Sequence, residues 1–202
     1  MSKNTVKEPA GEFSPSSGYT YADYLTFEFE EMVELIRGKI FRMSPAPRTY
    51  HQVISGTFHF IFHQYFQKTG CQVFHAPTDV VLPVANQKKE QSTTVVQPDI
   101  CVVCDITKIE ELCIFGAPDL IIEILSPHTR KKDLQYKYEV YEESGVREYW
   151  IVMPEEKLVE VFVLEKNEYK RIQTYTETDM VPCVIFKGLI VDLNEVFIKN
   201  KD

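Results

Sequence analysis

The stretch that decides the fold runs from Gln97 to Val152 and contains three apolar runs: QPDICVVC at 97–104, GAPDLIIEILSP at 116–127 and EYWIV at 148–152. Short apolar runs bounded by Pro or Gly are typical of buried strands. A charged segment with helical spacing, 129–144, separates the second run from the third. A crossover helix of this length favours parallel strands on either side of it. We therefore predict an α/β domain with strands at 99–104, 119–125 and 148–153.

An acidic residue lies inside the second of these strands. Strand side chains alternate between faces, so Asp119, Ile121, Glu123 and Leu125 share one face of the predicted sheet. An ionised carboxylate among apolar neighbours costs several kcal/mol unless a cation or hydrogen-bond donors pair with it. Glu123 therefore needs a partner, either a metal ion or a lysine.

The segment that follows provides a candidate lysine. Lys137 lies on one helical face together with Leu134, Tyr138 and Tyr141, the stripe expected to pack on the sheet. Two other interpretations stay open. The lysine amine can extend to solvent while its stem packs, or Lys137 can pair with Asp133 one turn earlier on the same helix.

A series of short motifs in a fixed order resembles the Uma2 family of restriction endonucleases, which belongs to the PD-(D/E)xK nuclease superfamily. The resemblance extends from about residue 19 to residue 193. It implies a restriction-endonuclease-like core with a central mixed β-sheet flanked by helices. The residues that carry it are Glu34 to Ile40, Met43-Ser44-Pro45, His51-Gln52, Pro98-Asp99, Pro118-Asp119-Leu120, Glu123, Ser126-Pro127, Asp133, Lys137, Tyr141, Gly145-Val146 and Glu148-Tyr149-Trp150.

Matching the motifs residue by residue implies roles for the acids and the lysine. Asp99 matches the acid of the first motif and Glu123 the acid of the second. The usual lysine stands two residues after the second acid, but here that position is Leu125, and the resemblance moves the role to Lys137. Asp99 and Glu123 are then ligands for Mg²⁺, with Mn²⁺ as a substitute, because hard divalent ions prefer oxygen ligands.

Two further residues are candidates for the same site. Glu34 matches an acidic position of the family, and the resemblance implies a third metal ligand. An ordinary strand glutamate is the alternative. His51 begins the apolar stripe of a predicted helix at 50–68, where a hydrogen-bonded core histidine is the usual interpretation. The resemblance favours a position near the active site, where His51 would contact the phosphate or a metal-bound water.

The function implied is a metal-dependent endonuclease that acts on DNA, with a homodimer as the expected assembly. The chain carries a net charge of −8, which argues against tight non-specific DNA binding. A basic stretch, Arg130-Lys131-Lys132, can either contact a phosphate backbone or form a solvated helical turn. The alternative function is a nuclease fold with weak or no catalysis that serves as a binding or assembly module.

The composition favours one globular domain. The chain has 202 residues, of which 44% are hydrophobic, enough for a single sizeable core. Residues 1–18 show no periodicity and predict a flexible lead-in to a domain at 19–202. The sequence contains no apolar run long enough for a membrane span and no signal-peptide pattern near Met1, so we expect a cytoplasmic location and no membrane partner.

The cysteines and two of the histidines are further candidate ligands. Cys101 and Cys104 form a C-x-x-C motif within a predicted strand, where an offset of three places them on opposite faces. We predict that all five cysteines, at 71, 101, 104, 113 and 183, are reduced. His59 and His63 lie one helical turn apart, but the sequence offers no third ligand beside them, which favours an ordinary surface pair.

Local signals outside the central stretch predict the remaining elements. Thr20 is a candidate N-cap for a helix at 21–31, and residues 32–43 predict two strands joined at Arg37-Gly38. Alternation of apolar and polar residues predicts a second hairpin across 165–168. A strand at 184–191 and a short helix from Leu193 complete the chain. The predicted fold is therefore α/β, with additional hairpins near both ends.

Overall fold

The computed structural model describes residues 18–43, 48–83, 87–126 and 132–197. The basic stretch at 130–132 and the predicted lead-in at 1–18 therefore lie wholly or largely outside the described part. The helices and strands are α1 Tyr21–Tyr24, β1 Val33–Ile36, β2 Lys39–Arg42, α2 Thr49–Phe66, β3 Gln72–His75, β4 Val80–Val81, β5 Val95–Val96, β6 Ile100–Val103, β7 Ile114–Phe115, β8 Leu120–Ile124, α3 Tyr138–Ser144, β9 Glu148–Met153, β10 Leu158–Glu165, β11 Glu168–Thr176, β12 Met180–Pro182, β13 Ile190–Asp192 and α4 Leu193–Val196.

The main sheet has six strands in the order β11-β10-β9-β8-β6-β3. Its three central strands, β6, β8 and β9, are the predicted ones. β8 and β9 run parallel, as the crossover between them requires, whereas β6 pairs with β8 in the antiparallel sense. The predicted mixed sheet is therefore confirmed, and every residue of the three central strands is buried.

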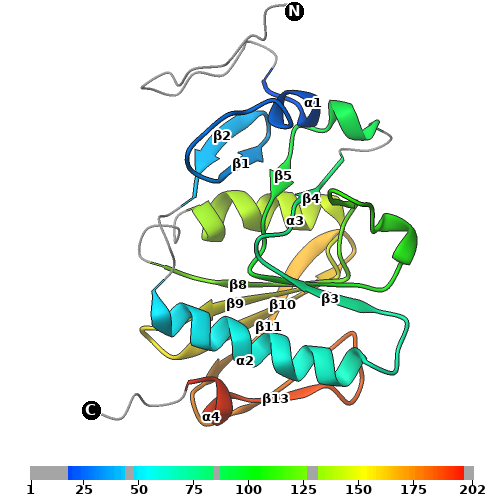
Figure 1. Cartoon of the computed structure of the whole chain (residues 1–202). Helices are drawn as coiled ribbons and strands as arrows, with labels where there is room; N and C mark the ends of the chain where they lie inside the picture. Colours follow the sequence, from blue (N-terminus) through cyan, green and yellow to red (C-terminus); the bar gives the residue numbers. More distant parts are fainter. Residues whose placement is uncertain (1–17, 44–47, 84–86, 127–131, 198–202) are drawn as a thin grey trace, which may run out of the picture.

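Helices cover both faces of this sheet (Figure 1). On one face, α2 packs on Leu120, Ile122 and Ile124 of β8. On the other face, α3 packs with Ile121 and the residue that follows β8, Leu125. The alternation predicted for the second strand is confirmed, and it places Glu123 on the face covered by α3.

A second sheet of five short strands, in the order β2-β1-β5-β4-β7, contains the predicted N-terminal hairpin. The hairpin turns at Arg37 and Gly38, which both have positive φ, as a tight two-residue β-turn requires. Gly38 also lies against the backbone of Gly18, where an added Cβ would approach within 2.7 Å. This sheet places β1, and with it Glu34, over the face of the main sheet that carries Glu123.

Two predicted elements differ in extent from the structure, and a third agrees with it. α1 ends at Tyr24 rather than residue 31, although Thr20 is its N-cap, as predicted, and forms a capping box with Asp23. The hairpin across 165–168 is confirmed as β10 and β11. In the C-terminal region, β13 covers only Ile190–Asp192 and pairs with β12 instead of extending through 184–191.

The helix predicted at 129–144 is only partly α-helical among the described residues. Residues 132–137 form a π-helical segment and α3 continues from Tyr138. A π-helix has more residues per turn than an α-helix, so the predicted stripe rotates. Leu134 accordingly is exposed, contrary to prediction, while Lys137 and Tyr141 are buried. The side chain of Asp133 lies outside the described part.

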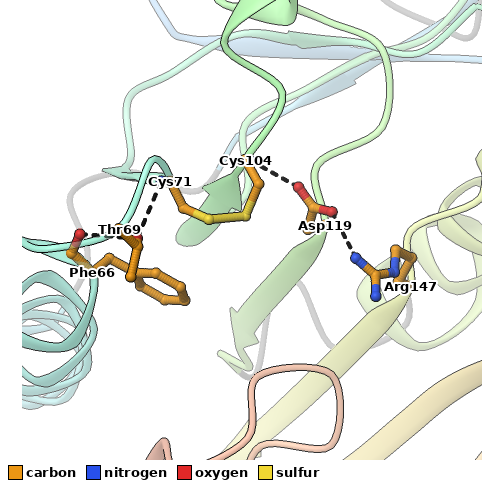
Figure 2. Close-up of a disulfide and its surroundings, with 6 residues drawn as sticks. All are labelled: Phe66, Thr69, Cys71, Cys104, Asp119 and Arg147. Atoms are coloured by element: carbon orange, nitrogen blue, oxygen red, sulfur yellow. Dashed lines mark hydrogen bonds and ion pairs between the residues drawn. A yellow bond between two sulfur atoms is a disulfide. The ribbon is translucent and has the colours of Figure 1, made fainter.

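A disulfide joins Cys71 to Cys104, so the prediction that all cysteines are reduced is wrong (Figure 2). The register of β3 against β6 pairs Gln72 with Val103, which brings the residues flanking these strands opposite one another. This pairing across 33 residues depends on strand register and has no signature in cysteine spacing. Cys101, Cys113 and Cys183 are free and buried, as predicted.

Replacing Cys71 with Ser is expected to lower the free energy of unfolding by about 3–4 kcal/mol, because a cross-link closing a loop of this length restricts the unfolded chain. Urea unfolding of the oxidised native chain and of the variant measures the difference. Adding a reductant should bring the native chain to the level of the variant and leave the variant unchanged. A native chain whose unfolding midpoint is insensitive to reductant would contradict the disulfide.

No helix among the described residues is both long and apolar enough to cross a membrane.

Candidate active site

A buried lysine links two acids that are 89 residues apart in the chain. Lys137 Nζ lies 2.8 Å from Glu123 Oε1 and 2.9 Å from Glu34 Oε1. None of the three side chains is more than 3% exposed. The structure thus excludes the interpretation in which Lys137 extends to solvent. Glu123 has the partner that its position inside a strand requires.

The local structure explains why these three side chains meet. Glu123 points from β8 toward α3, and Glu34 belongs to β1 of the second sheet. Lys137 is the last residue of the π-helical segment and immediately precedes α3. The lysine therefore enters between the two sheets at the point where the helix changes its geometry.

Tyr141 is a member of this cluster that the sequence placed on the packing stripe and in the motif series, without a predicted role in the site. It lies one helical turn after Lys137, and its hydroxyl donates to Glu123 Oε1 over 2.6 Å. Burial, reinforced by the negative charge of Glu123, raises the pKa of the Tyr141 hydroxyl well above its usual value. The tyrosine is thus a neutral donor, and together with Lys137 it fixes the orientation of Glu123.

Gln97 fixes the position of Glu34, the second acid that contacts Lys137. Its backbone N–H donates to Glu34 Oε1 over 2.8 Å, and its side-chain amide donates to Asp79 Oδ1 over 2.7 Å. Burial raises the pKa of the Asp79 carboxyl. Gln97 lies two residues before Asp99, so one short segment positions both Glu34 and the acid of the first motif.

Asp99 and His51 meet at the end of β8, directly beside Glu123. The Asp99 carboxylate accepts the backbone N–H of Ile124 over 2.7 Å, while its other oxygen lies 3.3 Å from His51 Nε2. The same imidazole nitrogen lies 3.2 Å from the carbonyl oxygen of Ile124. The five predicted site residues therefore form two groups of contacts, one at the Glu123 side chain and one at the Ile124 backbone, on adjacent residues of β8.

The two halves of this set differ in exposure. The side chains of Asp99 and His51 are 18% and 15% exposed, in contrast to the buried lysine cluster. His51 occupies the first turn of α2, whose N-terminus has no side-chain cap and no acidic residue. The exposed Arg48 immediately precedes this helix. The accessible end of the site thus combines a carboxylate, an imidazole and the positive end of a helix dipole.

The donor set suits a hard divalent ion. Asp99 Oδ1 and the Ile124 carbonyl oxygen converge on one point, now held by His51 Nε2, and the Glu123 carboxylate belongs to the adjacent residue. Carboxylate and carbonyl oxygens are the ligands that Mg²⁺ prefers. As the side chains stand, no three His, Cys, Asp or Glu residues of the described ranges are gathered around a common point as a metal centre.

Asp119, the other acid on the Glu123 face, has a structural position at the opposite end of β8 (Figure 2). Its carboxylate accepts the backbone N–H of Cys104 over 2.8 Å and pairs with Arg147 at 3.0 Å. It thereby fixes the start of β8 against β6, and it makes none of the contacts of the Lys137 cluster.

The class of protein is defined by a mixed sheet with one carboxylate inside a central strand, a second carboxylate directly before the neighbouring strand, and a lysine from the helical segment that follows. The fold is restriction-endonuclease-like. The chain belongs to the Uma2 family, whose model is described as "Putative restriction endonuclease" and matches residues 20–194.

The fold is also found among solved structures, one of which is similar over most of its length. It is a crystal structure described as a "putative nuclease belonging to DUF820" from Anabaena variabilis ATCC 29413. The two chains are 22% identical, with a TM-score of 0.69, and the alignment covers 88% of this chain and 97% of the other. No curated protein matches the sequence.

Proposed function

We propose that the protein is a metal-dependent endonuclease that hydrolyses phosphodiester bonds in DNA. The observation that carries this proposal is the position of Asp99, Glu123, Glu34, Lys137 and His51 in two neighbouring groups of contacts, at residues 123 and 124, within a restriction-endonuclease-like fold. Membership of the Uma2 family supports the nuclease class. The metal requirement, the choice of DNA and the role of each residue belong to the proposal.

Asp99, Glu123 and Glu34 would hold Mg²⁺, or Mn²⁺ in its place. A bound divalent ion would lower the pKa of a coordinated water and polarise the phosphoryl oxygen. The acids alone would repel a phosphate, and the net charge of −8 adds to this repulsion. We therefore expect little DNA binding at the site when divalent ions are removed.

The substrate phosphate would approach at Asp99 and His51, because these side chains form the exposed end of the site. There the imidazole can donate a hydrogen bond to a phosphate oxygen. The uncapped N–H groups of α2 also favour a negative charge in this position. Arg48 would add a charged contact to the phosphate backbone.

Lys137 would act from the buried side of the site, next to Glu123 and Glu34. Its ammonium group donates to Glu123 and Glu34, so it holds both carboxylates in place and offsets their charge. Tyr141 restricts Glu123 further. Lys137 would thus take the place of the lysine that the superfamily usually carries two residues after the second acid, where this chain has Leu125.

Plasmid nicking tests this function. Supercoiled plasmid, single-stranded DNA and RNA are incubated with the native chain in Mg²⁺, in Mn²⁺ and in a chelator. We expect metal-dependent nicking of the plasmid, reduced about 100-fold or more by Asp99→Asn, because this variant would lose a charged ligand of the ion that activates the water and stabilises the charge on the phosphate. Asp105→Asn is the matched control, since Asn also caps the short helix that Asp105 begins.

The outcomes separate the alternatives. Cleavage confined to RNA would support nuclease activity but contradict the proposal that DNA is the substrate. Absence of cleavage on all substrates, with no stabilisation by Mg²⁺ or Mn²⁺, would overturn the proposal in favour of a binding or assembly module. The homodimer stays a prediction, and sedimentation of the native chain across a range of concentrations tests it.

A further inference from the structure

Three histidines that play no part in the proposed catalytic site lie together between α2 and β3. The ring centroids of His59 and His63 are 5.9 Å apart, and those of His59 and His75 are 4.7 Å apart. His59 and His63 occupy successive turns of α2, whereas His75 is the last residue of the edge strand β3. α2 runs alongside this strand (Figure 1). A third histidine, absent from the neighbourhood of His59 and His63 in the sequence, thus lies beside them in the fold and comes from β3.

One of the three rings makes a hydrogen bond that is typical of metal-binding histidines. His75 Nδ1 lies 3.0 Å from the carbonyl oxygen of Ala76, and because a carbonyl only accepts, this nitrogen carries the proton. A hydrogen bond from one ring nitrogen to a carbonyl leaves the lone pair of the other nitrogen for a metal, the usual arrangement around metal-bound imidazoles.

The spacing suits a tetrahedral ion. With metal–nitrogen bonds of about 2.0–2.1 Å, the ring centroids of neighbouring histidine ligands lie roughly 5 Å apart. The two observed separations fall on either side of this value. As the side chains stand, no three His, Cys, Asp or Glu residues of the described ranges are placed to hold a metal ion, so these rings must turn to bind one. His63 and His75 are exposed, so their rings have room to turn.

We propose that His59, His63 and His75 form a second metal site, specific for a borderline transition cation such as Zn²⁺ or Co²⁺, that clamps α2 to the edge strand β3. Three neutral imidazoles with a water as fourth ligand match the preference of these ions. They offer nothing to Mg²⁺, which prefers oxygen ligands. The site is therefore chemically distinct from the proposed catalytic site and independent of it.

Co²⁺ titration tests the site, with the chain free of any affinity tag and excess Mg²⁺ present to occupy oxygen-ligand sites. We expect one equivalent of Co²⁺ to give the visible absorption of a tetrahedral complex. One equivalent of Zn²⁺ should raise the thermal unfolding midpoint. His63→Gln and His75→Gln should each weaken Co²⁺ binding on the order of 100-fold, since even an outer-shell change costs 10- to 100-fold. Gln64→Ala, next to His63 on α2, should bind as the native chain does.

Two results would overturn the proposal. Absence of a tetrahedral Co²⁺ spectrum in the native chain would exclude the site directly. Native-like Co²⁺ binding by His75→Gln would show that the helical pair alone holds the ion and that no clamp to β3 exists. Neither result depends on nuclease activity.

Discussion

Replacing Lys137 with Met is expected to lower the free energy of unfolding by about 3–5 kcal/mol and to abolish metal-dependent nicking. Lys137 is the cation shared by Glu34 and Glu123, and all three side chains are buried. Removing one member of a buried ionic cluster leaves uncompensated charge in a medium of low dielectric constant. Urea unfolding measures the stability, and plasmid nicking measures the activity.

The pH dependence of this loss identifies its cause. Without the lysine, two carboxylates face each other, and protonating either of them removes the repulsion. The stability deficit of Lys137→Met should therefore shrink as the pH is lowered toward the range where carboxylates titrate. Glu34→Gln combined with Lys137→Met removes one charge of each sign and should recover much of the stability. A deficit that is independent of pH and unchanged in the double variant would contradict the electrostatic explanation.

Replacing Glu148 with Ala is expected to destabilise the protein by about 3 kcal/mol or more, without any direct role in catalysis. This carboxylate is fully buried and accepts hydrogen bonds from the Trp150 indole at 2.7 Å and from the backbone N–H groups of Val184 and Ile185 at 3.0 and 2.8 Å. The Cys183 thiol lies 3.2 Å away as a fourth donor. Burial and then the charge of Glu148 raise the pKa of this thiol, which therefore keeps its proton.

The alanine variant leaves several donors without an acceptor in the interior, each at a cost of about 1–3 kcal/mol. It also releases residues 183–185 from β9. Glu148→Gln should be less harmful because one oxygen acceptor remains. Glu168→Gln, at an exposed position of the β10–β11 hairpin, is the control and should change stability by less than about 0.5 kcal/mol. A Glu148→Ala variant as stable as this control would contradict the anchoring role.

The sequence was informative where local geometry decides the outcome. The two-residue period of a strand placed Glu123 inside the fold, and the cost of burying a carboxylate there required a cation. Helical spacing then put Lys137 on the inner face. Both inferences needed only the neighbouring residues, and the contact between Lys137 and Glu123 confirms them.

Features that depend on contacts between distant segments were missed. The disulfide follows from the register of β3 against β6, and no cysteine spacing reveals that register. The third histidine beside His59 comes from the same strand. Leu134 was misplaced because a π-helical segment rotates the stripe, and the sequence carries no clear signal for such a segment.

Within the candidate site, Tyr141 shows the limit of patterns that record only hydrophobicity. A tyrosine on an inward helical face predicts packing equally well whether or not its hydroxyl has an acceptor. The signal that could have found it was its spacing of four residues from Lys137, which brings both donors to the same carboxylate. The sequence likewise marked Glu148 only as part of a motif, because three of its four hydrogen-bond donors belong to residues 183–185, which are distant in the chain.

Mg²⁺-dependent nicking of supercoiled plasmid by the native chain and by the Glu34→Gln/Lys137→Met double variant, at equal concentrations of folded protein, decides whether the buried lysine cluster is part of the active site. We expect nicking by the native chain, none in chelator, and none by the folded double variant. Equal nicking by both proteins would contradict the assignment of the buried lysine cluster to the active site.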